Sequence, residues 1–205
     1  MIDPMPTRGR PVIRPLTPAR WPDLVRLFGP RGAVEGCWCM WPRLAGGDYK
    51  RGRGARNKRA LHKIVAAGRP PGVLAYVDGE PAGWCSIAPR EGLERLRRSR
   101  VMGPVDERPA WVVTCFFVPP VHRGRGLAVA LLRAAVALAA RHGGRLVEGF
   151  PHDPKGAKPP GIFVWTGLAA TFRRAGFREV ARRSPTRPVM RKAVGPRHRR
   201  VMGRR

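Results

Sequence analysis

The residues best suited to chemistry form the run Val-His-Arg-Gly-Arg-Gly at 121–126, which joins two apolar segments. The segment before it, WVVTCFFV at 111–118, is apolar and β-favouring and predicts a buried strand. The segment after it predicts a long helix closed by two glycines. A helix N-terminus offers unpaired N–H groups and positive potential, and glycines let a ligand approach the backbone. The run therefore predicts a cradle for a phosphate-bearing ligand, with Arg123 and Arg125 adding charge at its edge.

Two other phosphate loops do not match this run. A Walker loop requires Gly-Lys followed by Ser or Thr, and a dinucleotide fingerprint requires a third glycine or alanine where GRGLAV lacks it. A second RGRG run, at 51–54, follows no apolar strand, and its context GGDYKRGRGARNKR predicts a solvated basic loop. Contact with a nucleotide 3′-phosphate or an acidic substrate is the alternative for that second run.

Read as Arg-x-x-Gly-x-Ala, residues 123–128 resemble the coenzyme-A loop of the GNAT superfamily of acyl-CoA N-acyltransferases. In that family an apolar strand ends in Val, a Pro-containing turn follows, and Arg-x-x-Gly-x-Gly/Ala opens a long helix. The same places are filled here by Val118, Pro119, Arg123, Gly126 and Ala128. TFRRAGFREV resembles the family's closing helix, Gly-Phe pair and final strand, so the resemblance runs from about residue 11 to 192. The runs GCWCMW, GWCSIAPR, RLRRSR, TCFFV and VEGFP narrow it to a bacterial subgroup.

The resemblance implies one α/β domain, whose mixed, mostly antiparallel sheet splays between its fourth and fifth strands and is flanked by helices. We expect it to cover residues 11–193, between a flexible lead-in at 1–10 and a basic, disordered tail at 194–205. The residues themselves predict a hairpin at Asp78-Gly79, between strands near 72–77 and 81–88. The sequence pattern also predicts strands in PVIRPL, RLVEGF, FREVARR and RPVMRKA, and helices after Thr17-Pro18, in NKRALHKIVAAG and in WTGLAATFRRAG.

The resemblance also implies acetyl-CoA as co-substrate, an amine acceptor and direct transfer between them. The cofactor contacts would then fall on Phe116, Val118, Arg123, Gly124, Arg125, Gly126, Leu127, Ala128 and Phe172. Phe172 stands where the family often has a tyrosine that protonates the leaving thiolate. The only tyrosines, Tyr49 and Tyr76, lie far from it in sequence. A protein that binds acyl-CoA without catalysis is therefore an alternative.

Glu148 is the first candidate for the base that deprotonates the amine, because a glutamate in an apolar strand is costly to bury without a role or a partner. Pairing with an arginine is the equally weighted alternative. Asp153 and His152, in the following loop, are weaker candidates, and His122 is expected to line the phosphate loop.

The chain has four cysteines, and Cys115 lies within the apolar strand. It could act as an acid for the leaving thiol or as an acyl carrier, although a small core residue is the favoured interpretation. The sequence contains Cys37-Trp-Cys39, but a Cys-x-Cys pair with two lone cysteines is not a zinc-site spacing, so no metal is predicted. We expect GCWCMW to pack over the site, with Trp38 and Trp84 lining an acceptor pocket; a plain hydrophobic lid is the alternative.

The composition, with a formal net charge of +28, raises the question of a nucleic-acid partner. Only six of the 41 basic residues are lysine, a skew that a GC-rich genome would produce, so nucleic acid is not favoured. The 205 residues are enough for one substantial core. The chain has no apolar stretch of about 18 residues and no leader-like N-terminus, so a cytoplasmic protein with reduced cysteines and no membrane partner is expected. The resemblance adds a homodimer as a candidate state.

Overall fold

The computed structural model describes residues 9–154 and 164–195. They form one seven-stranded sheet with the strand order β1-β2-β3-β4-β5-β7-β6. Its strands are β1 (Val12–Pro15), β2 (Gly72–Val77), β3 (Glu80–Pro89), β4 (Trp111–Phe117), β5 (Leu146–Gly149), β6 (Arg178–Arg182) and β7 (Pro188–Ala193). Every neighbouring pair is antiparallel except β4 and β5, which run parallel. The predicted mixed, mostly antiparallel α/β fold is confirmed.

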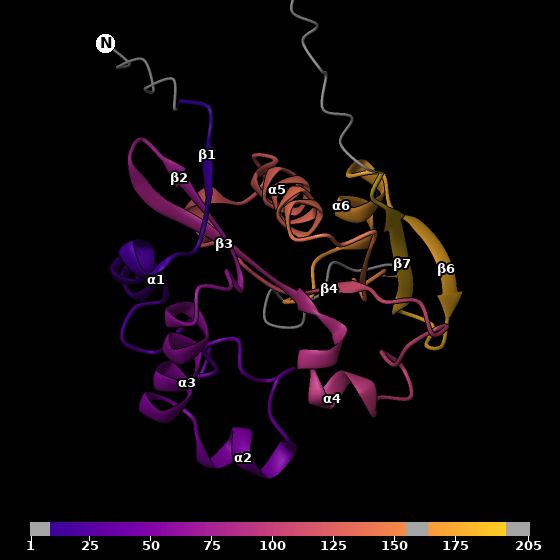
Figure 1. Cartoon of the computed structure of the whole chain (residues 1–205). Helices are drawn as coiled ribbons and strands as arrows, with labels where there is room; N and C mark the ends of the chain where they lie inside the picture. Colours follow the sequence, from indigo (N-terminus) through magenta and orange to yellow (C-terminus); the bar gives the residue numbers. More distant parts are fainter. Residues whose placement is uncertain (1–8, 155–163, 196–205) are drawn as a thin grey trace, which may run out of the picture.

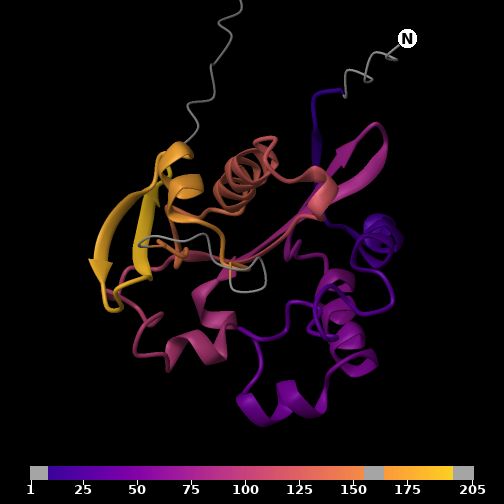
Figure 2. The ribbon, with the colours of Figure 1, turned by 180° about the vertical axis from the view of Figure 1, so that it is seen from behind.

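Helices cover both faces of the sheet (Figure 1). They are α1 (Trp21–Phe28), α2 (Gly46–Arg51), α3 (Ala55–Ala66), α4 (Glu94–Arg97), α5 (Leu127–Arg141) and α6 (Ala169–Arg174). The apolar stripe of α5 packs on one face with α6, whereas α1 and α3 pack on the other face around Leu74 and Trp84. Seen from behind, α2 and α3 lie together on the side of the sheet away from α5 (Figure 2). The sheet therefore separates two apolar cores.

The hairpin between β2 and β3 shows how local sequence sets this fold. Asp78 and Gly79 adopt φ angles of 52° and 82°, the left-handed pair that a tight antiparallel turn needs. The two strands pair antiparallel on either side of it, as the sequence predicts. One predicted helix is shorter than its pattern indicates. Trp165 and Thr166 form a turn, Gly167 has a φ of 87° and Leu168 is extended, so α6 begins only at Ala169.

The sheet opens between β4 and β5, its fourth and fifth strands. The two strands pair only from Trp111 to Val113, opposite Val147 to Gly149, where β5 ends. A register shift against β3 leaves Thr114 as an extra residue in β4, and the strand then continues to Phe117 without a β5 partner. Such a bulge bends the strand that carries it. The second half of β4 therefore offers a free edge to the splay.

The predicted lead-in and tail fall largely outside the described residues. Residues 1–8 and 196–205 contain most of the expected lead-in and tail, so the boundaries at 11 and 193 stay predictions. Within residues 9–154 and 164–195, no helix combines the length and the apolarity needed to cross a membrane.

Candidate active site

The N-terminus of α5 is open and unpaired. Two glycines before it, Gly124 and Gly126, have φ of 76° and 77°. A Cβ placed on either would meet nothing within 4 Å. In the described part of the chain, none of the backbone N–H groups from Gly124 to Ala128 donates a hydrogen bond to another protein group. These donors, at the positive end of a fifteen-residue helix, can therefore receive an anion.

Two predicted cofactor contacts, one on β4 and one directly after it, are already engaged within the chain. The Phe116 N–H donates to the carbonyl of Trp165 over 2.6 Å. The Val118 carbonyl accepts the Nε–H of Arg123 over 2.8 Å. Arg123 thus fastens the loop to the end of β4, while Arg125 is exposed. An acyl chain that follows the edge of β4 has to take the place of the Trp165 carbonyl.

Phe172 closes the inner end of the splay. Its ring is fully buried and makes edge contacts with Phe116 and Phe177, with ring centroids 6.2 and 5.0 Å apart. A Cβ on Gly149 would come within 2.5 Å of the Phe172 ring, so only glycine at the end of β5 leaves room for it. The side chain is a packing element, and it brings no hydroxyl to the site.

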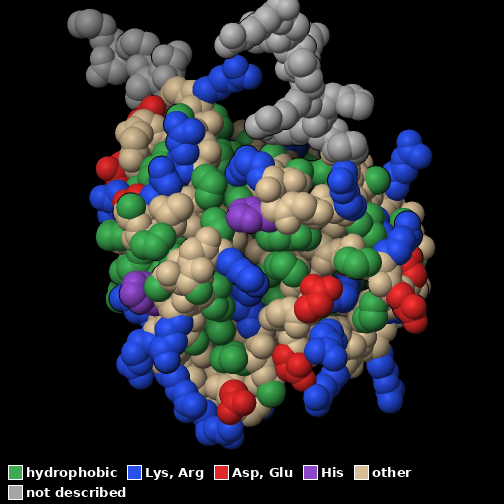
Figure 3. All heavy atoms as spheres, viewed as in Figure 1, with side chains coloured by type: hydrophobic (Ala, Val, Ile, Leu, Met, Phe, Trp, Pro, Cys, Tyr) green, Lys and Arg blue, Asp and Glu red, His purple; other side chains and the backbone are tan. Residues whose placement is uncertain are grey.

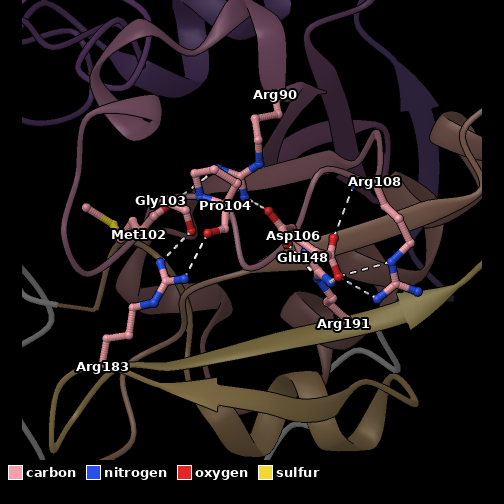
Figure 4. Close-up of polar contacts among 9 residues, drawn as sticks. All are labelled: Arg90, Met102, Gly103, Pro104, Asp106, Arg108, Glu148, Arg183 and Arg191. Atoms are coloured by element: carbon pink, nitrogen blue, oxygen red, sulfur yellow. Dashed lines mark hydrogen bonds and ion pairs between the residues drawn. The ribbon is translucent and has the colours of Figure 1, made fainter.

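Glu148 is paired rather than poised as a base. Its carboxylate is fully buried and accepts a hydrogen bond from Arg191 Nε over 2.8 Å, and Arg90 forms an ion pair with its other oxygen (Figure 4). Burial, with the charge of Arg191, lowers the pKa of Arg90 to about 10. The arginine-paired alternative is thus the one observed, because a guanidinium group engages each oxygen of the carboxylate.

The same cluster fixes the segment between α4 and β4. Arg191 also donates to Asp106 over 2.6 Å, and Arg183 donates to the carbonyls of Gly103 and Pro104 over 2.9 and 2.8 Å (Figure 4). Arg191, followed by Arg108, holds the pKa of Asp106 far below its usual range. The cluster therefore joins β5, β7 and a loop into one scaffold.

The weaker base candidates also have structural surroundings. Asp153 accepts hydrogen bonds from Arg182 and Arg173 over 2.8 and 3.2 Å, which lower the pKa of its carboxyl, Arg182 contributing most. His152 pairs its backbone with Gly167 and with the start of α6. His122 ends the short 3-10 turn that precedes the glycine run.

A cavity of about 240 Å³ lies on the α1 side of β4. Four segments of the chain supply its lining: Ala33, Val34, Glu35, Cys37, Cys39, Trp41, Pro42, Tyr49, Cys115, Phe116, Phe117 and Trp165. Cys115 and Phe117 face it from the α1 side of the sheet, and it reaches the free edge of β4 at Phe116, whose ring packs against the α5 core. The cavity thus adjoins the place where the splay begins.

The two tryptophans predicted to line an acceptor pocket, Trp38 and Trp84, lie in the core on the α1 side of the sheet. Both are buried, Trp38 being 3% and Trp84 0% exposed, and neither contributes to the cavity wall. Trp84 faces inward from β3, while φ of 44° turns Trp38 toward Trp21 and Phe28. From the GCWCMW segment, Cys37, Cys39 and Trp41 line the cavity.

Tyr49 is a residue that the sequence argument dismissed. It lies in α2 and contributes a phenol to the cavity that also contains Phe116. Its pKa is raised, chiefly by burial, so its hydroxyl stays protonated and can donate. No local motif marks it, because its proximity to the splay arises only when the 31–51 segment folds against β4.

The cavity thiols differ in how readily they ionise. Cys39 accepts the Nε1–H of Trp84 over 3.3 Å, and its pKa is lowered mainly by a hydrogen bond from Cys115. The same bond is the leading cause that raises the pKa of Cys115, and burial raises the pKa of Cys37 to about 11. All four cysteines are free. Arg43 contributes a nearby positive charge to Cys39.

The segment that supplies most of the cavity wall, residues 33–42, carries backbone strain. Four non-glycine residues between 33 and 39 have left-handed φ angles, namely Ala33 (69°), Glu35 (48°), Trp38 (44°) and Cys39 (54°). Each such residue costs roughly 1–3 kcal/mol and persists only where the surrounding packing imposes it. Strain of this kind is common at functional sites. The strained segment is therefore a candidate part of a functional site, and not only a hydrophobic cover over the core.

Comparison with known proteins agrees with this geometry. Residues 38–153 match the family model described as Acetyltransferase (GNAT) family, which spans more than half of the chain. The protein therefore belongs to the GNAT acetyltransferase family. No match was found among curated proteins.

Several solved structures share the fold. A GNAT-family acetyltransferase of Streptococcus agalactiae has a TM-score of 0.53 at 15% identity, covering 90% of this chain and 96% of that one. The PaiA N-acetyltransferase of Thermoplasma acidophilum, solved with coenzyme A, gives 0.51 at 12% identity, covering 91% and 100%. The GNAT domain of S. lividans PAT gives 0.51 at 18% identity, covering 91% and 92%. At these identities the likeness concerns the fold.

Proposed function

We propose that the protein is an acyl-CoA-dependent N-acyltransferase that moves an acetyl group from acetyl-CoA to an amine by direct transfer. The observation that carries this proposal is the free edge of β4, which leads straight into the unpaired N-terminus of α5. Such an arrangement suits a ligand with an extended arm and a pyrophosphate. Membership of the GNAT family, and the coenzyme A held by the PaiA relative, support this choice of donor.

The residues around the splay fit acetyl-CoA in two different ways. The N–H groups from Gly124 to Ala128 would hold the pyrophosphate, with Arg125 beside them. At the other end, the Phe116 N–H would polarise the acyl carbonyl once it exchanges Trp165 for the ligand. The thioester supplies the activated carbonyl, so the chain has to position an amine, accept a proton and donate one.

The proton donors and acceptors of the site line the cavity. Cys115 has a raised pKa, so it stays protonated and suits the role of acid toward the leaving thiolate rather than that of acyl carrier. Tyr49 is a second hydroxyl donor in the same cavity. Cys39 ionises more readily than the other cavity thiols and is our candidate for accepting the amine proton. Glu148 is withdrawn from that role by its two arginines.

Calorimetric titration with acetyl-CoA tests the proposal. We expect micromolar binding to the wild-type protein, and at least tenfold weaker binding to Gly126→Asp, which adds a negative charge at the α5 N-terminus. Gly143→Asp is the matched control, because Gly143 also has a left-handed φ of 81° and open space, but at the other end of α5. Binding that is absent, or equal in all three proteins and abolished by salt, would contradict the proposal and favour a polyanion-binding protein.

An assay of amine acetylation separates the proposed enzyme from the alternative, a protein that binds acyl-CoA without catalysis. If acetyl-CoA binds at the α5 N-terminus but no amine from a broad panel is acetylated, the binding part of the proposal stands and the transfer part fails. Release of free coenzyme A thiol measures that transfer directly.

A further inference from the structure

The cavity on the α1 side of β4 is placed to hold an acceptor. Cys115, Phe116 and Phe117, all from the free half of β4, contribute to its wall. The Phe116 N–H is the group that we assign to the acyl carbonyl, so an occupant of the cavity lies beside the reacting carbon. The open α5 N-terminus belongs to the other side of the strand. Donor and acceptor could therefore approach from opposite faces.

The lining of this cavity is aromatic. Trp41 and Trp165 meet edge to face with their ring centroids 5.0 Å apart. The guanidinium of Arg95 lies 4.7 Å from the ring centre of Trp41 and 5.4 Å from that of Tyr49, which holds both rings in place. Rings arranged in this way favour another ring, which they contact by face or edge.

The charges around the cavity disfavour an acceptor with several positive charges. Among the described lining residues, Glu35 is the one carboxylate, and it is 62% exposed and already ion-paired with Arg53. Arg43 and Arg95 add two further cations near the wall. Lys and Arg side chains also spread over the visible face of the molecule (Figure 3), as the net charge of +28 requires. A polyamine, an aminoglycoside or a lysine-rich peptide would meet repulsion throughout its approach.

The volume limits the acceptor further. At about 240 Å³ the cavity is smaller than the roughly 300–1,000 Å³ of pockets that hold drug-sized ligands. One ring system with a short chain suits it better than a large substrate. The four left-handed residues around its wall indicate that the packing imposes this shape at a cost.

From these observations we infer that the acceptor is an aromatic monoamine, whose ring packs against Trp41, Tyr49 and Trp165 while its nitrogen points to Phe116. This inference names the substrate class for the proposed N-acyltransferase, and its catalytic part rests on that function. Binding of the amine to the cavity does not depend on it.

Acetyl transfer to three amines tests the class. The probes are 2-phenylethylamine, ethylamine, which has the same amine without the ring, and spermidine, which carries several charges. We expect kcat/KM for 2-phenylethylamine to exceed that for ethylamine by about tenfold or more, since burial of the ring contributes only in the first case. Spermidine should be the poorest acceptor at low ionic strength. Equal rates for ethylamine and 2-phenylethylamine, or a preference for spermidine, would overturn the inference while leaving the N-acyltransferase function intact.

A variant that fills the cavity mouth ties the effect to this site. Val34 lines the cavity and is 39% exposed, so Val34→Trp can occupy the mouth without disturbing the core. We expect it to lower kcat/KM for 2-phenylethylamine at least about tenfold, with acetyl-CoA affinity unchanged. Val180→Trp is the matched control, because Val180 is a 46% exposed valine on β6, outside the cavity. Equal loss in both variants, or in neither, contradicts the assignment.

A binding measurement without acetyl-CoA separates failure of the inference from failure of the function. Trp41 and Trp165 line the cavity, so 2-phenylethylamine should change the tryptophan fluorescence in a saturable way that Val34→Trp weakens. Saturable binding with no transfer to any amine would retain the cavity assignment and reject the N-acyltransferase function. A non-saturable response in wild type, with transfer to ethylamine intact, would do the reverse.

Discussion

The α5 N-terminus and the cavity meet at the same strand but are built in opposite ways. At the α5 N-terminus, backbone N–H groups and two left-handed glycines leave open space. At the cavity, side chains from four separate segments enclose a small volume, and non-glycine residues adopt the left-handed backbone. A backbone site recognises a phosphate whatever side chains surround it, whereas a side-chain cavity recognises one shape. Under the proposed function, the α5 N-terminus would bind acetyl-CoA through its phosphates, and the cavity would select the amine by its shape.

The Glu148→Gln variant tests whether the α5 N-terminus or the cavity depends on the buried cluster of Glu148, Arg90 and Arg191. We expect Glu148→Gln to lower the free energy of unfolding by about 3–5 kcal/mol, measured in urea, because two buried guanidinium groups lose their carboxylate. Glu179→Gln is the control, since Glu179 pairs with Arg182 at the surface, where such pairs contribute about 0–1 kcal/mol. A Glu148→Gln protein of normal stability that had lost kcat would show instead that Glu148 is a catalytic base.

The next prediction concerns the cavity thiols, because the pKa of Cys39 is lowered while that of Cys37 is raised. Because alkylation requires the thiolate, the pH at which alkylation of Cys39 by iodoacetamide reaches half of its plateau should lie below that of Cys37, whose pKa is raised to about 11. The Cys39 rate should reach its plateau at a lower pH than that of an ordinary thiol. Trp84→Phe, which removes the indole donor, should shift that plateau to higher pH. Peptide mass spectrometry gives the rate at each pH, and a half-plateau pH for Cys39 at or above that of Cys37 would contradict the assignment.

Arg125 probes the donor end more gently than a glycine substitution. Arg125→Ala should weaken acetyl-CoA binding by roughly three- to tenfold and reduce its dependence on salt, because an exposed cation beside the pyrophosphate is lost. Arg141→Ala, an exposed arginine at the C-terminal end of α5, should leave the affinity unchanged. Calorimetry at two salt concentrations checks both, and equal weakening in the two variants would mean that only overall charge matters.

The smallest effect is expected at Asp153. Arg182, and after it Arg173, lower the pKa of this carboxyl, so its stabilising contribution is present above the unfolded pKa and is lost as pH falls through the folded pKa. Asp153→Asn should therefore change the unfolding free energy at pH 7 by less than about 1 kcal/mol and leave kcat unchanged. The difference from wild type should vanish in acid. A clear loss of kcat would return Asp153 to the list of bases.

Features that depend on neighbouring residues could be predicted from the sequence. The strand at 111–118, the glycine run and the Asp78-Gly79 hairpin all appear where their patterns place them, because turn geometry and apolar runs act over a few residues. The shortened α6 is the exception within this group. The helix begins only at Ala169, because Gly167 before it has a left-handed backbone, although the helical pattern of the sequence starts earlier.

Features that depend on contacts between distant segments of the chain could not be predicted from the sequence. Glu148 had two interpretations that the sequence alone could not separate, since its partners Arg90 and Arg191 come from distant segments. Trp84 was assigned to the acceptor pocket, but the β3 register turns it into the core. Tyr49 was set aside for its distance along the chain, yet it shares a cavity with Phe116.

By itself, then, the sequence determined the order of elements, the open glycine run at the start of a long helix and the absence of a hydroxyl at Phe172. These follow from backbone preference and residue identity, which are local properties. Only the tertiary structure decided that Glu148 is paired with two arginines, that the Trp165 carbonyl accepts the Phe116 N–H, and that residues 33–49 form an aromatic cavity against β4. Those outcomes depend on packing between segments far apart in the chain, which no local pattern encodes.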